Sequence, residues 1–178
     1  MAMEMNDVIL VDERDKAIGT MEKLKAHKIG VLHRAFSIFL FNDNGELLLQ
    51  KRNESKYHSG GLWTNTCCSH PKPGEILKEG ALIRLDEEMG IEADIKFVFS
   101  FIYKAEFDNG LTENEFDHVF IGSFNDVPNI NPDEVSDWKY MSLKSIKNEI
   151  DLSPEIYSEW FKIALPKIEK HLFKNGGA

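Results

Sequence analysis

The segment from Trp63 to Ile91 constrains the fold of this chain more than any other stretch. Between Glu75 and Met89 the apolar residues recur with helical spacing, at Leu77, Ala81, Leu82, Leu85 and Met89. Gly90 follows directly, and glycine readily adopts the left-handed conformation in which many helices end. The pattern predicts an amphipathic helix over 75–89, which has to bury one face against a larger core.

Runs of apolar, aromatic and β-branched residues predict strands on both sides of this helix. They are Val8–Val11, Ala35–Phe41, Glu46–Arg52, Ala93–Phe107, Phe116–Phe124 and Trp138–Met141. Turn signals at Asn42–Gly45 and Asp108–Gly110 predict two hairpins. Residues 20–34 show little periodicity and are interpreted as a functional connection, and Asn53–Thr66 is interpreted as a loop.

The last part of the chain predicts a second helix. Ser153–Pro154 is a favourable helix start, and Pro166 predicts a kink within the apolar pattern that follows. With 178 residues, of which 42% are hydrophobic, the chain is long enough for one domain with a full core. We expect a single domain over 1–178, with frayed ends at about 1–5 and 175–178.

Composition narrows the classes of partner. A net charge of −9 argues against a nucleic-acid partner, although the segment Lys23–Lys56 carries seven basic and three acidic residues. That local excess suits a small anionic ligand, and an unevenly charged solvated surface is the alternative. No apolar run approaches the roughly 20 residues of a membrane span, and the first residues lack a signal-peptide pattern. We therefore expect a cytoplasmic protein with no membrane partner.

Three histidines and two glutamates are candidates for a metal site: His27, His33, His70, Glu113 and Glu115. If the segment around Asn114 is extended, the two carboxylates flanking it lie on one face of a sheet. Such a set suits Zn²⁺, Mn²⁺ or Mg²⁺. The alternative is that the histidines and the glutamates lie on solvated surfaces. His58, His118 and His171 are assigned structural roles.

The only two cysteines are adjacent, at Cys67 and Cys68. Cys68 lies two residues from His70, where an imidazole or a metal can tune its thiol, although a buried inert cysteine is the commoner case. Glu87 and Glu88 lie at the C-terminal end of the predicted helix, where the helix dipole favours cations, which suggests that they bind one. An ordinary surface ion pair between Glu88 and Arg84 is the alternative.

Two motifs make the chain recognisable. Trp63–Pro71 reads Trp-Thr-Asn-x-x-Cys-x-His-Pro, and Glu113–Glu115 reads Glu-Asn-Glu. From Val8 to about Pro154 the chain closely resembles the type 1 isopentenyl diphosphate isomerases, which are members of the Nudix superfamily. The resemblance implies an α+β fold, a Nudix-like α/β/α sandwich around a mixed β-sheet.

The Nudix box, G-x5-E-x7-R-E-U-x-E-E-x-G-U, can be laid over Ser69–Ile91. The positions that match are Glu75, Leu85, Glu87, Glu88, Gly90 and Ile91. Ser69, Ile83 and Arg84 stand where the box has Gly, Arg and Glu. The lost glutamate is one that Nudix hydrolases use around their metal, so the resemblance favours an isomerase over a diphosphate hydrolase.

The resemblance implies an isomerisation of isopentenyl to dimethylallyl diphosphate, in which a proton is added at the terminal carbon and another is removed from the methylene on the opposite face. Cys68 and Glu115 match the catalytic positions, and Tyr103 matches a tyrosine that hydrogen-bonds to the glutamate. The family's divalent-metal ligands match His27, His33, His70, Glu113 and Glu115. Glu88 matches a residue that helps to hold Mg²⁺ on the substrate diphosphate, and the implied diphosphate contacts are Lys23, Arg52, Lys56 and Ser69.

One departure concerns a tryptophan that the family usually carries after a Ser/Thr–Pro pair near the end of the chain. Here Ser153–Pro154 is followed by Glu155. Trp160 lies more than a turn further along the chain, so the role of stabilising the cation that forms on protonation of the alkene is not transferred to it. Trp63 or Tyr103 is expected to present an aromatic face to this cation instead, and Glu155 a negative charge.

Two other functions stay open from the sequence: a Nudix-type hydrolase of another diphosphate, and a non-catalytic module that binds a metal or a diphosphate. In each case the partner is a small molecule. We expect a monomer, with a homodimer as the alternative.

Overall fold

The computed structural model of the chain describes residues 6–176. In chain order the elements are β1 (Asp7–Val11), β2 (Ala17–Glu22), α1 (Lys23–Ile29), β3 (His33–Phe41), β4 (Glu46–Arg52), β5 (Trp63–Thr64), β6 (Cys67–Ser69), α2 (Leu77–Met89), β7 (Ile95–Glu106), β8 (Thr112–Ser123), β9 (Val135–Ser142), α3 (Leu143–Leu152), the 3₁₀ turn η1 (Pro154–Ile156) and α4 (Glu159–Asn175).

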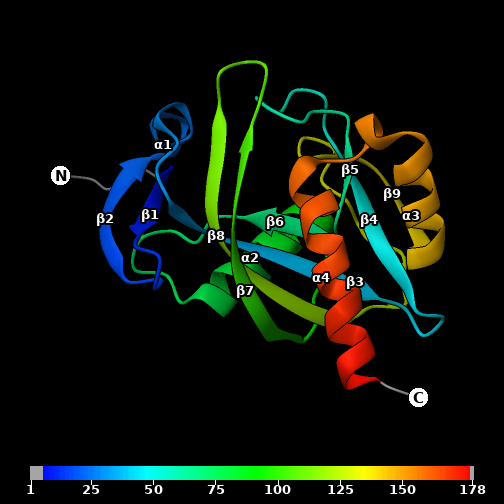
Figure 1. Ribbon diagram of the computed structural model, residues 1–178. Coiled ribbons are helices and arrows are strands. Elements are labelled where there is room, and N and C mark those ends of the chain that lie inside the picture. The colour runs from blue at the N-terminus through cyan, green and yellow to red at the C-terminus, as the bar shows by residue number, and fades with distance from the viewer. Residues whose placement is uncertain (1–5, 177–178) are drawn as a thin grey trace.

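The strand β3 is the centre of a mixed sheet (Figure 1). It pairs in parallel with β8 along its whole length and antiparallel with β1, β4 and β6. The long antiparallel β7–β8 hairpin extends one side of the sheet, and β9 pairs with β4 on the other. The strands β6 and β8 therefore flank β3 on either side.

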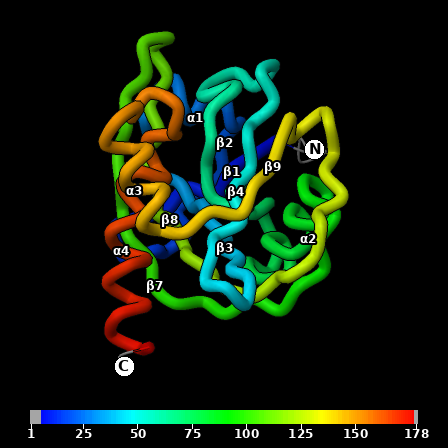
Figure 2. The backbone as a smooth tube through the Cα atoms, turned by 90° about the vertical axis from the view of Figure 1, so that its right-hand side faces the viewer, coloured from blue at the N-terminus to red at the C-terminus, as the bar shows by residue number. Residues whose placement is uncertain are grey.

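Helices cover both faces of this sheet. Figure 2 shows α3 and α4 on one side and α2 on the other. Successive side chains of a strand point to opposite faces, so Phe36, Ile38 and Leu40 of β3 pack in the core beneath α2, while Phe39 packs in the core beneath α4. This arrangement confirms the predicted α/β/α sandwich around a mixed sheet.

The predicted central helix is α2. It begins at Leu77, two residues later than the apolar pattern indicates, because the carboxylate of Glu75 accepts a hydrogen bond from the backbone N–H of Lys72 in the preceding turn. It ends as predicted at Gly90, which has φ 60° and donates its N–H to the carbonyl of Asp86.

The predicted strands are confirmed as β1, β3, β4, β7, β8 and β9. The predicted hairpin between β3 and β4 is wrong in extent, since the two strands pair only at Phe41 and Leu47. Further along, at Phe36–Ile38, the strand β6 pairs with β3 instead of β4. Residues 20–34, interpreted as a connection, contain the end of β2, the helix α1 and the start of β3.

The C-terminal helix begins later than predicted. Ser153–Pro154 introduces only the turn η1, and α3 before it was not anticipated. Tyr157 then forms a β-bridge with Trp63, and the N–H of Ser158 donates to the carbonyl of Trp63 at 3.0 Å. The chain is held extended there, so α4 starts only at Glu159; Pro166 lies inside it.

Asn175 is the last residue of α4, so the expected fraying does not begin there. The expectations for residues 1–5 and 177–178 lie outside the described part of the chain. Within residues 6–176, no helix combines the length and the apolar character needed to cross a membrane.

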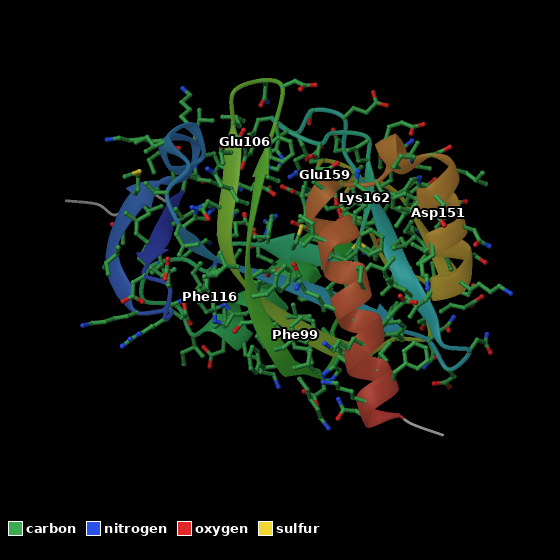
Figure 3. The ribbon with its side chains drawn as sticks, in the orientation of Figure 1. Phe99, Glu106, Phe116, Asp151, Glu159 and Lys162 are labelled. Atoms are coloured by element: carbon green, nitrogen blue, oxygen red, sulfur yellow. The ribbon has the colours of Figure 1, made fainter. Side chains whose placement is uncertain are left out.

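Figure 3 shows Glu106, near the tip of the β7–β8 hairpin, and Glu159, at the start of α4, at the same end of the molecule as α1.

A stability prediction follows from the end of α2. Gly90 and Gly45 both have positive φ, 60° and 73°, but an added Cβ at Gly90 would clash with the carbonyl oxygen of Asn129, whereas at Gly45 it would meet nothing within 4 Å. Gly45→Ala should lose about 1–2 kcal/mol from the left-handed conformation alone. Gly90→Ala should lose clearly more in urea unfolding, and equal losses would contradict this packing.

Candidate active site

The alternation of strand β6 separates the two cysteines. Ile38 pairs with Cys67 and Ser37 with Cys68 across β3 and β6. Cys67 is fully buried in the core beneath α2, with its Sγ 3.5 Å from Oε2 of Glu88. Cys68 faces the α4 side of the sheet. The two thiols therefore belong to different surroundings although they are adjacent in sequence.

Cys68 lines a pocket on the α4 face of the sheet. Most of the residues around it are aromatic, basic or acidic, and they come from α1, β3, β4, the loop that follows β4, β6, β7, β8 and α4. The lining consists of Lys23, Phe36, Ser37, Arg52, Tyr57, His58, Cys68, Ser69, His70, Tyr103, Glu113, Glu115 and Trp160. We call it the Cys68 pocket. The catalytic candidates Cys68, Glu115 and Tyr103 are thus brought together.

The sheet register fixes the contact between Tyr103 and Glu115, which are paired across β7 and β8. The hydroxyl of Tyr103 donates to Oε2 of Glu115 at 2.5 Å and also lies 3.0 Å from Oε2 of Glu113. Burial, followed by the charges of the two carboxylates, raises the pKa of Tyr103 well above its usual value. The phenol therefore stays protonated and remains a hydrogen-bond donor.

Four of the five predicted metal ligands form one compact group. The ligand atoms of His27, His33, His70 and Glu115 all lie within 4.8 Å of one another. Nδ1 of His27 lies 2.7 Å from the carbonyl of Lys23, and Nδ1 of His33 lies 2.9 Å from the carbonyl of Val31. A carbonyl can only accept, so each Nδ1 carries the proton and each Nε2 keeps its lone pair.

The free lone pairs fit a divalent cation. Nε2 of His27 is buried and has no hydrogen-bond partner among the described residues. Burial, against the opposing charge of Glu115, lowers the pKa of His70 to about 3, so this imidazole is neutral. Neutral imidazoles beside a carboxylate are the donor set that Zn²⁺ and other first-row divalent ions prefer.

The fifth predicted ligand, Glu113, lies in a second group, with His27 and His58, whose ligand atoms are also within 4.8 Å of one another. Burial and the charge of Glu115 raise the pKa of Glu113 well above its usual value. His58, assigned a structural role from the sequence, lines the Cys68 pocket instead, and its Nε2 is 3.3 Å from Oε1 of Glu113.

A charged groove, lined by both basic and acidic side chains, adjoins the Cys68 pocket and shares Lys23, Ser69 and His70 with it. Lys56 and Arg84 also line this groove. The predicted diphosphate contacts therefore lie along one continuous surface, with Arg52 in the pocket and Lys56 in the groove. Burial, and then the nearby charge of Arg52, lowers the pKa of Lys23, while the charge of Glu115 opposes that shift.

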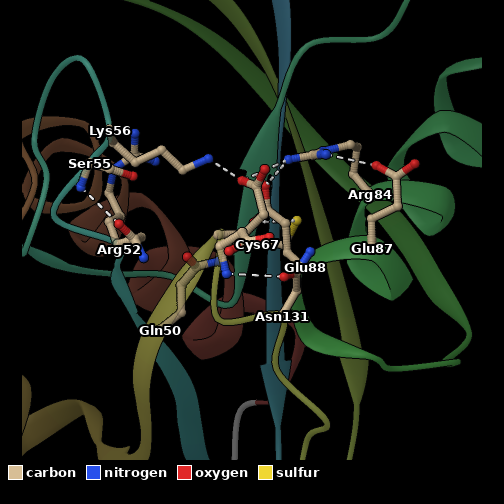
Figure 4. A network of polar contacts seen from close by, with 12 residues as sticks. Gln50, Arg52, Ser55, Lys56, Cys67, Arg84, Glu87, Glu88 and Asn131 are labelled. Atoms are coloured by element: carbon tan, nitrogen blue, oxygen red, sulfur yellow. Dashed lines mark hydrogen bonds and ion pairs between the residues drawn. The ribbon is translucent and has the colours of Figure 1, made fainter.

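Glu88 lies away from both histidine groups, in a buried network on the α2 side of the sheet (Figure 4). It accepts hydrogen bonds from Gln50 at 2.9 Å and from Arg84 at 2.5 Å. Arg84 also contacts Glu134, which pairs with Lys56. The ion pair between Arg84 and Glu88 is thus present, but as part of a network. Arg84 was not among the predicted site residues.

Of the two residues expected to supply the aromatic face, Tyr103 lines the Cys68 pocket and Trp63 does not; Trp160, to which the role was not transferred, also lines it. The ring of Trp160 is buried and has Cζ of Arg52 5.1 Å from its centroid. Trp63 lies outside the lining, with Nζ of Lys139 over its ring, and Glu155 is exposed in η1. The sequence signal for Trp160 is the preceding Ser158–Glu159, which we passed over in favour of Ser153–Pro154.

Comparison with solved structures identifies the fold. The crystal structure of DR0079 from Deinococcus radiodurans has a TM-score of 0.76 at 18% identity and covers 90% of this chain and 98% of its own. A MutT protein from Methanosarcina mazei has a TM-score of 0.64 at 20% identity, covering 78% and 94%. At such identities the likeness concerns the fold alone.

Sequence comparison identifies the family. The NUDIX domain model matches residues 31–161. An isopentenyl-diphosphate Delta-isomerase from Pectobacterium atrosepticum is 49% identical over 93% of this chain and 93% of its own length. Isopentenyl-diphosphate Delta-isomerase 2 of Photorhabdus laumondii is 53% identical over 87% and 88%. The chain therefore belongs to the NUDIX domain proteins and, among them, to the isopentenyl-diphosphate Delta-isomerases.

Proposed function

We propose that this chain interconverts isopentenyl and dimethylallyl diphosphate, using Cys68 and Glu115 as its pair of proton-transfer groups, within isoprenoid biosynthesis. The observation that carries the proposal is their placement: they stand on β6 and β8, on either side of β3, and line one pocket beside a groove that contains Lys23, Lys56 and Arg84. A 1,3-allylic shift needs one group that adds a proton and one that removes a proton.

Glu115 is the proposed acid, and Cys68 the proposed acceptor of the methylene proton. Tyr103 orients Glu115 through the 2.5 Å hydrogen bond to Oε2, which leaves Oε1 next to Nε2 of His70 at 2.8 Å. Burial raises the pKa of Cys68, and the positive charge of Arg52 opposes that rise. Arg52 thus favours the thiolate that takes up a proton.

The walls of the pocket suit a cationic intermediate. Protonation of the alkene produces a tertiary cation, which water would capture. Trp160 and Tyr103 line the pocket with aromatic rings. The face of an aromatic ring attracts a cation, by about 2 kcal/mol or more where water is excluded. We assign this role to Trp160 together with Tyr103.

The diphosphate is proposed to bind Lys23, Arg52, Lys56 and Ser69, with Arg84 as a further cation of the same groove. Glu88 is proposed to help hold Mg²⁺ on the diphosphate, since its carboxylate pairs with Arg84, which lines the groove. The His/Glu group is proposed to hold one divalent ion, with Zn²⁺ or Mn²⁺ favoured over Mg²⁺ by its imidazoles. When bound, that ion supplies positive charge next to Glu115, which makes the carboxyl group a better acid.

The contacts of Arg84 argue against a diphosphate hydrolase. Arg84 stands where the Nudix box has a glutamate, and its guanidinium pairs with Glu87 at 2.7 Å and Glu88 at 2.5 Å. A hydrolase would need a carboxylate at this position for its metal, and the chain carries a cation there instead. We further propose that the chain acts as a single domain, as a monomer, in the cytoplasm.

The reaction is tested by ¹H and ³¹P NMR of the purified protein with isopentenyl diphosphate, Mg²⁺ and Zn²⁺ or Mn²⁺ in D₂O. We expect conversion to dimethylallyl diphosphate with deuterium in a methyl group, and loss of conversion after chelation of the metals. Release of phosphate without isomerisation would favour the hydrolase. Binding without any reaction, with metal restored, would favour a non-catalytic module.

The two cysteines give a matched pair of variants. Cys68→Ser should lower kcat by about 10²- to 10⁴-fold, the usual contribution of a general acid or base. Cys67→Ala should keep a nearly unchanged kcat, because its thiol faces α2 rather than the pocket. Steady-state assays, with circular dichroism to check folding, measure both. A loss of turnover confined to Cys67→Ala would refute the assignment.

A further inference from the structure

His58 is the one histidine around the Cys68 pocket that the proposed metal centre leaves without a role. It lies in the loop between β4 and β5, and its side chain is 5% exposed. Together with His27 and Glu113 it forms a second compact group of potential ligands beside the first. The two groups share a single residue, His27.

The shared atom is suited to a cation. Nδ1 of His27 donates to a backbone carbonyl, and Nε2 is buried without a partner among the residues that the structure describes. An ion bound to that nitrogen would lie within reach of both groups. His58 and Glu113 belong to one of these groups, and His33, His70 and Glu115 to the other.

The separation of the other two atoms also fits coordination. Nε2 of His58 and Oε1 of Glu113 lie 3.3 Å apart. A charge-assisted hydrogen bond between such atoms is usually shorter, about 2.7–2.9 Å. Two ligands that each lie about 2.0–2.2 Å from one Zn²⁺ are separated by roughly 3–3.4 Å. His33 and His70 show the same separation, 3.3 Å between their Nε2 atoms.

The ring of His58 is held in place by its neighbours. It stacks on Phe107 at 5.0 Å between centroids and on His27 at 5.8 Å, and meets Trp160 edge to face. Nδ1 lies 3.4 Å from the hydroxyl oxygen of Ser59, which can accept a hydrogen bond from its N–H. Nε2 then keeps its lone pair, as in His27 and His33.

We propose that His58 is a further ligand of the His/Glu metal centre, where it would bind the ion together with His27 and Glu113. The inference rests on the proposed function, because it presumes that the centre binds a metal. It also gives His58 a purpose in the reaction. Glu115 has to act as an acid while it touches the ion, and a ligand set that does not depend on Glu115 keeps the ion in place throughout proton transfer.

The test uses Zn²⁺ alone, with the metal-free full chain and a chromophoric chelator as competitor. His58→Phe keeps an aromatic ring against Phe107 and removes both nitrogens, and His58→Ala removes the ring as well. We expect both variants to bind Zn²⁺ at least about tenfold more weakly. His171→Phe is the matched control, because His171 lies on α4 against Phe99, and its affinity should be unchanged.

X-ray absorption of the Zn²⁺-loaded proteins gives an independent reading, the number of imidazole ligands. His58→Phe should show one fewer than the wild type. If His58→Phe keeps the Zn²⁺ affinity and the number of imidazole ligands of the wild type, the inference is overturned. A loss of Zn²⁺ affinity confined to His58→Ala would also overturn it, because it would indicate a packing role for the ring. Failure of the wild type to bind Zn²⁺ would instead contradict the metal centre itself.

Discussion

The placement of the site depends on the alternation of side chains along β3 and its two neighbours. Because successive residues of a strand face opposite sides of a sheet, one face of these strands carries the apolar residues that pack beneath α2. The other face carries the polar groups Cys68, Glu113 and Glu115, together with the core beneath α4. A shift of one residue in β6 would exchange Cys68 for Cys67 and destroy the pocket.

The second constraint is the cost of burying polar and charged groups. An unpaired charge in a protein interior is expensive, yet His27, His33, Glu113 and Glu115 are almost completely buried. Their contacts with backbone carbonyls and with Tyr103 satisfy part of their hydrogen-bonding capacity. The polar atoms that keep no hydrogen-bond partner, above all Nε2 of His27, are the atoms that a bound cation would contact. The acidic cluster on α2 is neutralised by Arg84 instead.

Local patterns predicted much of this molecule. Helix α2, with its end at Gly90, follows from helical periodicity, and β7 and β8 follow from aromatic runs around a turn. The common face of Glu113 and Glu115 follows from spacing alone. Spacing to His70 singled out Cys68, and motif resemblance gave its catalytic role and added Tyr103; the structure places both in one pocket with Glu115.

Features that depend on contacts distant in sequence were missed. The parallel pairing of β3 with β8 joins residues about eighty positions apart and has no local signal. The place of Trp160 was not predicted because the family's Ser/Thr–Pro pair was matched to Ser153–Pro154, whereas the bridge between Tyr157 and Trp63 delays the start of α4 to Glu159. His58 lies in a loop without periodicity, so only the folded chain places it beside Glu113.

The most direct test of the account is to map which thiol faces the site. The intact protein would be treated with N-ethylmaleimide, with and without isopentenyl diphosphate and Mg²⁺, and digested for peptide mass spectrometry. The account predicts slow modification of Cys68, suppressed by the substrate, and no modification of Cys67 while the protein stays folded. Modification of Cys67 in preference to Cys68, or labelling of Cys68 that the substrate does not affect, would contradict it.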